Sequence, residues 1–231
     1  IEMAKISGLA LMNSKNLEPH KYTTYGMGEV IKNCLDHGFN KFIIGIGGSA
    51  TNDGGLGMVS ALGGVCTDKY GNLIKQGIDG LKNLYEINLS GMDKRIQHST
   101  FQIACDVNNT LYGKNGATYT FGPQKGFTSE QIKIVDNHMQ NYGNIIDNLS
   151  KSKISSQPGS GAAGGIGAAA VYFLNGQLES GAKIILEYLE FEKQCKNIDV
   201  VITGEGQIDF QTINNKAPIA VARIARKYNI P

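Results

Sequence analysis

Three carboxylates follow short apolar runs of the chain, in positions suited to acid–base or metal chemistry. Asp53 lies in a polar, glycine-rich segment, Asp106 closes an apolar run, and Asp209 shares a turn with Glu205. Carboxylates at the end of a strand can bind a divalent cation or act as a general base. Each has a plainer alternative: the segment of Asp53 could be an ordinary strand-to-helix connection, Asp106 could cap a turn, and Glu205 and Asp209 could merely solvate a loop.

Glycine-rich turns accompany these acids. The longest stretch, KFIIGIGGSATNDGGLG (Lys41–Gly57), runs from an apolar segment through a glycine-rich turn into a helical pattern that begins at Leu56. Glycine lets the backbone approach an anion closely, and a helix start offers unpaired N–H groups. An ordinary strand-to-helix connection is the alternative interpretation. The candidate binding residues of this loop are Gly47, Gly48, Ser49, Asn52 and Gly54.

A second glycine-rich segment, PGSGAAGGIG (158–167), leads into small residues that predict a helix over 162–174. It includes Gly161 and Gly164 and satisfies the G-x-G-x-x-G spacing of dinucleotide-binding loops. That fingerprint requires a preceding strand, and KSKISSQ (151–157) does not resemble one, so the sequence disfavours a nicotinamide-dependent oxidoreductase. Close helix packing and close approach of a phosphate-bearing ligand remain the two interpretations.

One lysine stands in a comparable setting. Lys125 lies between Gln124 and Gly126 in FGPQKG, which the composition predicts to be a rigid, proline-led turn. An ammonium group held in such a turn could reach a fixed anion, whereas an isolated lysine is more often a solvated surface charge.

Short apolar, β-branched runs predict the strands that would position these side chains. They cover 42–46, 101–106 and 200–202, and the third is followed by a turn that contains Gly204. The carboxyl ends of strands in open α/β sheets are where such folds bind their ligands.

Helical periodicity fills the space between the strands. Apolar residues over 27–35 recur at helical spacing, and Gly38 is a natural stop. Thr128 and Gln131 form a capping box ahead of the clearest helical stripe in the chain. Helices that alternate with strands along the chain in this way predict an α/β fold.

Composition limits the function classes. The chain has 231 residues with 41% hydrophobic content, enough for a substantial core, and its 22 basic and 20 acidic residues argue against a nucleic-acid or membrane partner. Four widely spaced cysteines disfavour a zinc site and a disulfide framework. A cytoplasmic, enzyme-like domain fits best. Ile1 and Pro231 stand where neighbouring strands would adjoin, so we expect a fragment of a longer protein.

Five segments in order resemble the type I glycerate kinase family of bacteria: GIGGSATNDGGLGM, ACDVNN, FGPQKG, PGSGAAGGIGAA and VITGEGQIDFQT. They extend from Gly45 to Thr212, and IEMAKISGL and TTYGMGEVI resemble further family segments, so the resemblance covers nearly the whole chain. The chain departs from the family pattern at Gln207, where arginine is common, and at Asn215 and Ala220, where glycines are common.

The resemblance implies an ATP- and Mg²⁺-dependent kinase that phosphorylates D-glycerate at its 2-hydroxyl, in a cleft between two α/β domains. Residues 1–197 would form the inserted α/β domain, and residues 198–231 would form part of a Rossmann-like domain built from both chain ends. Family members extend further on both sides and carry an Asp-Ser-Phe-Lys type of motif outside this chain. We therefore expect little or no kinase activity from the chain alone.

On this plan the glycine-rich loops would hold either a nucleotide phosphate or the glycerate carboxylate, and Lys125 would neutralise a phosphate. Asp53, Asp106 and Asp209 would divide the roles of base and magnesium ligand, with Asp106 and Asp209 as the metal candidates. The other candidates for substrate or phosphate contact are Gly161, Gly164, Gly204 and Glu205.

A second function class remains open on the sequence. A non-catalytic module that binds a sugar phosphate or a nucleotide would also need glycine-rich loops. It would not need carboxylates beside them, so the kinase is the preferred interpretation. The sequence does not indicate an oligomeric state.

Overall fold

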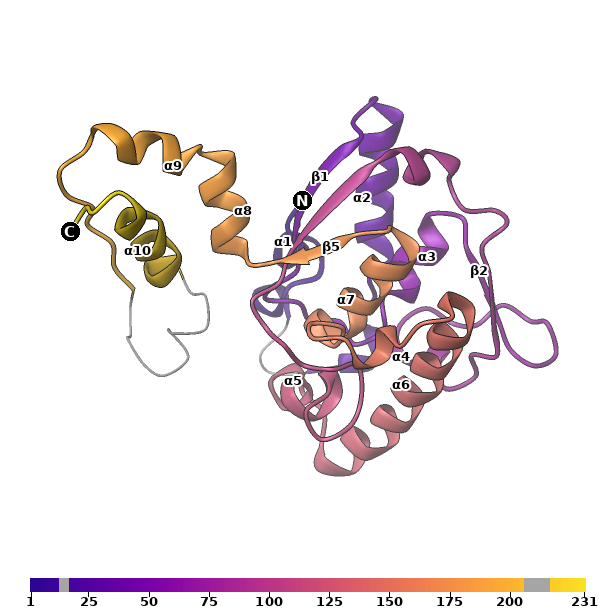
Figure 1. Ribbon diagram of the computed structural model, residues 1–231. Helices are drawn as coiled ribbons and strands as arrows, with labels where there is room; N and C mark the ends of the chain where they lie inside the picture. Colours follow the sequence, from indigo (N-terminus) through magenta and orange to yellow (C-terminus); the bar gives the residue numbers. More distant parts are fainter. Residues whose placement is uncertain (13–16, 206–216) are drawn as a thin grey trace. The chain divides into compact units, whose positions relative to one another are not determined.

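The structure is a computed structural model that describes residues 1–12, 17–205 and 217–231 (Figure 1). The chain divides into two compact units, Ile1–Leu178 and Glu179–Pro231. The predicted domain boundary between residues 197 and 198 stays a prediction.

The first unit is built on a sheet of three strands in the order β1-β4-β5. β1 (Lys41–Gly45) and β4 (Thr100–Ala104) are parallel, and β5 (Gln177–Glu179) follows α7 (Ala162–Phe173) in the chain. Phe42 faces Phe101 across the pair, and their rings stack with centroids 4.7 Å apart. Both strands bury alternate side chains, as a sheet with one face on a core requires. The predicted strands at 42–46 and 101–106 are thus confirmed.

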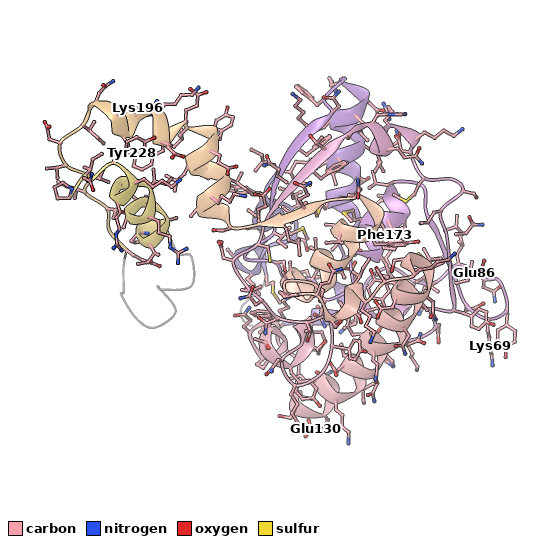
Figure 2. The ribbon with its side chains drawn as sticks, in the orientation of Figure 1. Lys69, Glu86, Glu130, Phe173, Lys196 and Tyr228 are labelled. Carbon is pink, nitrogen blue, oxygen red and sulfur yellow. The ribbon has the colours of Figure 1, made fainter. Side chains whose placement is uncertain are left out.

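A separate pair of short strands lies in the region whose sequence pattern is weakest. β2 (Val65–Thr67) and β3 (Glu86–Asn88) are antiparallel, with only their central side chains buried. Lys69, which follows β2, and Glu86, the first residue of β3, are both exposed (Figure 2).

Helices make up much of the rest of the described chain. Those of the first unit are α1 (Met3–Ser7), α2 (Tyr25–Asp36), α3 (Leu56–Ala61), α4 (Ile78–Leu81), α5 (Ala117–Lys125), α6 (Ser129–Ser150) and α7 (Ala162–Phe173). Those of the second unit are α8 (Gly181–Tyr188), α9 (Phe191–Gln194) and α10 (Ala217–Lys227). Short 3₁₀ turns occur at η1 (Leu9–Leu11), η2 (Pro19–Lys21), η3 (Lys94–His98), η4 (Ile154–Ser156) and η5 (Cys195–Asn197). No described helix is long and apolar enough to span a bilayer.

The α/β class and most predicted helices are confirmed. Gly38 follows α2 with φ of +83°, as its role as a helix stop requires. The capping box is present at α6, where the Gln131 N–H donates to Thr128 Oγ1 at 3.3 Å and the Thr128 N–H donates to Gln131 Oε1 at 2.9 Å. Capping by these two side chains fixes where the longest helix begins.

The predicted strand over 200–202 is wrong for this structure. These residues have no strand conformation, and the Ile202 side chain is 93% exposed. Val201 donates a single backbone hydrogen bond to the Pro231 carbonyl at 3.0 Å. An apolar run becomes a strand only when a neighbouring strand pairs with it, and the described part of the second unit offers none.

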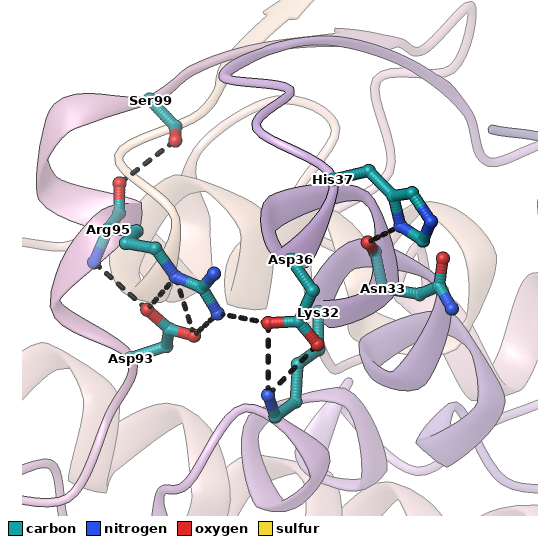
Figure 3. A network of polar contacts seen from close by, with 7 residues as sticks. All are labelled: Lys32, Asn33, Asp36, His37, Asp93, Arg95 and Ser99. Atoms are coloured by element: carbon teal, nitrogen blue, oxygen red, sulfur yellow. Dashed lines mark hydrogen bonds and ion pairs between the residues drawn. The ribbon is translucent and has the colours of Figure 1, made fainter.

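An exposed charge network joins the end of α2 to η3 (Figure 3). The Arg95 guanidinium bonds Asp36 at 2.7 Å and Asp93 at 2.6 Å, and Lys32 lies 3.3 Å from Asp36. Hydrogen bonds from Arg95 are the main cause that lowers the pKa of both carboxyl groups.

Replacing Arg95 by Met should make acid unfolding less steep. Asp36 and Asp93 have folded-state pKa values below the ordinary 3.8, so the stability that they contribute is present above that pH and is lost as the pH falls through the folded values. The effect should be small, because Asp36 and Arg95 are exposed and their charges are screened. Urea denaturation at low and at high salt measures this effect, over a range of about pH 2 to 6 in which carboxyl groups titrate. Identical pH slopes in both proteins at low salt would contradict the expectation.

Candidate functional site

A pocket of about 300 Å³ opens at the carboxyl ends of β1 and β4. Parallel neighbouring strands bring their following loops together at this edge, which is where open α/β sheets bind ligands. The start of α7 and the last turn of α5 close the pocket. Its lining residues are Gly45, Ile46, Gly47, Gly48, Ser49, Ala104, Cys105, Asp106, Val107, Phe121, Gln124, Lys125, Ala162 and Ala163.

The loop after β1 presents backbone to the pocket. A Cβ added at Gly47 would meet nothing within 4 Å, so this stretch of main chain is open toward the cavity. Gly48 has a backbone φ of +67°, a conformation that residues with a side chain rarely adopt. Ser49 is buried beside them and lines the same pocket. Gly47, Gly48 and Ser49, which the sequence indicated as candidate binding residues, therefore lie together along one polar wall of the pocket.

Lys125 supplies a positive charge to this wall. Its side chain is 1% exposed, and its Nζ donates to the Thr51 carbonyl at 2.6 Å and to Ser49 Oγ at 3.4 Å. Burial lowers the pKa of its ammonium group to about 8, against an opposing effect of the Asp53 charge. The ammonium group is thus held by neutral oxygens, with its charge poorly solvated.

The predicted turn around Lys125 is wrong, because this residue ends the helix α5. Pro123 lies within that helix, and Gly126, with φ of +98°, ends it. A helix also explains two pocket residues that the sequence interpretation missed, Phe121 and Gln124. Residues four apart share a helix face, so helical spacing from Lys125 would have found Phe121.

Asp53 is buried behind the pocket and does not line it. Its Oδ2 accepts hydrogen bonds from the Thr24 N–H at 2.8 Å, Thr24 Oγ1 at 3.0 Å and Thr23 Oγ1 at 3.2 Å. Its Oδ1 accepts from the Gly55 N–H at 3.1 Å. A carboxylate that is occupied by four protein donors ties the loop to the start of α2, and it is poorly placed to meet a ligand.

Gly164 supports the glycine-rich loop from behind. Its carbonyl accepts from the Gly54 N–H at 2.9 Å, and its own φ is +70° in a left-handed segment at the start of α7. Gly161 packs against another loop, since a Cβ there would lie 1.9 Å from the Thr110 carbonyl oxygen. The predicted helix over 162–174 therefore has a non-helical start, and these glycines serve close backbone packing.

Asn52 is also part of this second layer. It is buried, and its Nδ2 donates to Thr118 Oγ1 on α5 at 3.0 Å. Asn52 Oδ1 and Thr51 Oγ1 are buried without a hydrogen-bond partner. The loop is thus fixed to α5 from two sides, through Asn52 and through Lys125.

The remaining acids are divided between the two units. Asp106 lines the pocket from the loop after β4. Gly204 and Glu205 are exposed in the second unit, and Asp209 lies outside the described residues. Within the described ranges there is no cluster of three acidic, histidine or cysteine side chains that could hold a metal ion.

Burial also determines the state of the thiol in the pocket. Cys105 Sγ donates to the Val107 carbonyl at 3.4 Å, and burial raises the pKa of this thiol. The thiol therefore adds no negative charge near neutral pH, and Asp106 and Lys125 are the charged side chains among the described lining residues.

Fold and pocket together define a class: α/β proteins with a glycine-walled, lysine-containing pocket at the carboxyl ends of parallel strands. Comparison with known proteins identifies the family within that class. The model of the glycerate kinase family matches residues 1–231, and the chain belongs to that family.

Its relatives agree with this assignment. The chain is 46% identical to glycerate 2-kinase of Escherichia coli K12 and 44% identical to glycerate kinase of Bacillus subtilis 168, over its whole length in both cases. It is similar to the crystal structure of a Salmonella typhimurium LT2 protein provisionally named glycerate kinase 2, with a TM-score of 0.91 and 46% identity. The match covers this whole chain and 61% of that structure, and the chain spans 61% and 60% of the two named relatives.

Proposed function

We propose that this chain forms the larger part of a kinase that transfers the γ-phosphoryl group of ATP to the 2-hydroxyl of D-glycerate, with Mg²⁺. Family membership and the name of the Escherichia coli relative, glycerate 2-kinase, support the acceptor and the position. The single observation that carries the proposal is the buried ammonium group of Lys125 in the pocket that the open backbone of Gly47 also lines.

This arrangement suits the anionic end of a substrate. An ammonium group in a water-poor pocket attracts a carboxylate or a phosphate more strongly than one in bulk water would. The open glycine backbone lets such a group approach the loop closely. The ligand of this pocket is therefore the glycerate carboxylate or a nucleotide phosphate, two sources of the same chemistry.

Asp106 is the described carboxylate that lines the pocket, so it would hold the magnesium ion or accept the proton of the glycerate hydroxyl. Oxygen ligands of this kind are what Mg²⁺ prefers, whereas the carboxylate of Asp53 is occupied by protein donors. When bound, Mg²⁺ supplies charge neutralisation on the transferred phosphoryl group. Glu205 and Asp209 remain further candidates for these two roles.

Lys125 and the loop at 47–49 would do the positioning. They would fix the anionic end of the ligand so that its hydroxyl lies in line with the phosphoryl donor. Because the relatives are longer than this chain, we propose that residues outside it complete the active site and that the 231-residue chain alone has little or no turnover.

The test is a coupled assay of ADP formation by the complete gene product, with ATP, Mg²⁺ and a panel of small hydroxy acids. The proposal expects ADP only when D-glycerate is present, and NMR of the product should find phosphate on the 2-oxygen. ATP binding without turnover would instead favour the non-catalytic binding module. Titration calorimetry with D-glycerate and with ADP, each alone, distinguishes the two sources of the anion, because loss of affinity on replacing Lys125 identifies the one that it binds.

A further inference from the structure

Two buried side chains of opposite charge meet the loop at residues 51–53. Asp53 is part of this loop, and Lys125 donates a hydrogen bond to its Thr51 carbonyl. Asp53 is fully buried and Lys125 is 1% exposed. The hydrogen bonds of Lys125 go to Thr51 and Ser49, and those of Asp53 come from Thr23, Thr24 and Gly55. Both charges therefore have only neutral hydrogen-bond partners. A buried charge is costly without an opposite charge nearby, and attraction between charges is strong where water is excluded.

The loop joins these charges through a continuous set of contacts. The Thr51 carbonyl accepts from Lys125 Nζ, and Asp53 follows two residues later in the chain. Thr24 Oγ1 donates to Asp53 and accepts from the Met58 N–H at 2.9 Å, so one carboxylate connects the starts of α2 and α3. The position of Asp53 therefore determines where the Thr51 carbonyl, and with it the ammonium group, can lie.

We propose that Asp53 is a positioning residue that holds the loop under Lys125 and keeps this lysine charged from a distance, without contacting the ligand itself. The inference rests on the proposed function only in taking Lys125 as the group that binds the anion. It departs from a catalytic or metal-binding role for Asp53, which its four protein donors and its place behind the pocket wall both disfavour.

The other titratable groups near Lys125 leave few alternatives. Asp106 and Cys105 face the same pocket from the loop after β4, and burial keeps the thiol neutral by raising its pKa. Tyr142 of α6 donates to the Gly54 carbonyl at 2.5 Å, and burial raises its pKa well above the ordinary value, so it is neutral too. The α7 residues that face the pocket carry no charge. Asp106 is thus the carboxylate against which Asp53 must be compared.

The test follows the protonation of Lys125 directly. The complete gene product is labelled with ¹³C at lysine Cε, and the resonance of Lys125 is assigned by its loss in Lys125→Met. We expect a midpoint near pH 8 in the parent chain. Asp53→Asn, which keeps the size of the side chain and removes its charge, should lower the midpoint by about one pH unit.

The matched controls are Asp106→Asn and Asp136→Asn. Asp136 is a buried carboxylate on α6 that accepts from the Gly113 N–H at 3.0 Å through both oxygens, away from the pocket. Asp136→Asn should leave the Lys125 midpoint unchanged, and Asp106→Asn should move it less than Asp53→Asn does. A folded Asp53→Asn chain with an unchanged midpoint, or a larger shift from Asp106→Asn, overturns the proposal.

Asp53→Asn could also prevent folding, and a second variant covers that outcome. If the charges act on each other, Asp53→Asn combined with Lys125→Met should be more stable to urea than Asp53→Asn alone, since no unpaired charge remains buried, even though the hydrogen bonds of the carboxylate are still lost. A double variant that is no more stable than Asp53→Asn, while Lys125→Met alone folds, overturns the proposal. Because the readouts need no substrate, they stand even if the complete protein does not phosphorylate D-glycerate.

Discussion

Lys125→Met should lower D-glycerate-dependent ADP formation by the complete gene product about 10²- to 10³-fold, the range seen when one group that stabilises a developing charge is removed. The side chain provides the positive charge among the described residues of the pocket. Methionine keeps the apolar length of lysine, so the pocket loses its charge and the Thr51 carbonyl loses its donor. Steady-state kinetics against D-glycerate and ATP measure the loss, and a rise in KM for one substrate identifies which anion Lys125 binds.

Lys133→Met is the matched control. Lys133 is an exposed lysine on α6, so its replacement should leave kinetics and folding unchanged. The pH dependence has a definite sign: Lys125 loses its charge as the pH rises through about 8, so affinity for the anion should fall there in the parent enzyme. A Lys125→Met enzyme that folds and turns over normally would remove Lys125 from the site.

Local patterns predicted the frame of this site well. The apolar run after Lys41 and the glycines that follow it are enough to indicate a strand, an open turn and a helix, because each signal lies within a few neighbouring residues. The Thr128–Gln131 capping box is equally local. Such signals place backbone and do not report which distant side chains meet it.

The role of Asp53 depends on residues far away in the sequence. Its donors Thr23 and Thr24 precede it by 30 and 29 residues, and nothing in their local pattern marks them as its partners. From the sequence, an acid in a glycine-rich turn suggests a catalytic role. Its position behind the pocket wall suggests instead that it supports the loop. Separating the two readings needs the tertiary contacts.

For Lys125, the sequence interpretation assigned the wrong secondary structure. Glycine and proline around it are typical of a turn, yet Gly122 and Pro123 lie inside α5. That helix packs between α6 and α7, with Phe127 and Ile132 close to Gly122, and tertiary packing overrides the weak local propensity. The sequence interpretation placed Lys125 in a turn, whereas the residue ends a helix and lines the pocket.

Gly164→Ala should be strongly destabilising, because both steric overlap and backbone strain act at this position. An added Cβ would lie 2.2 Å from the Thr51 carbonyl oxygen and 2.6 Å from the Asn52 Cα, which are both backbone atoms. The residue would also keep a φ of +70°. Left-handed strain and overpacking together should cost about 3 kcal/mol of the free energy of unfolding, measured by urea denaturation.

Gly71→Ala separates the two causes of that loss. Gly71 has φ of +83° in an exposed turn, and a Cβ there would meet nothing within 4 Å. It should therefore cost only the left-handed strain, about 1 kcal/mol. The difference between the variants measures the close approach of α7 to the loop at 51–52, which also carries the acceptor of Lys125. Equal losses would mean that the loop moves aside freely, and the ammonium group would then not be held by a rigid wall.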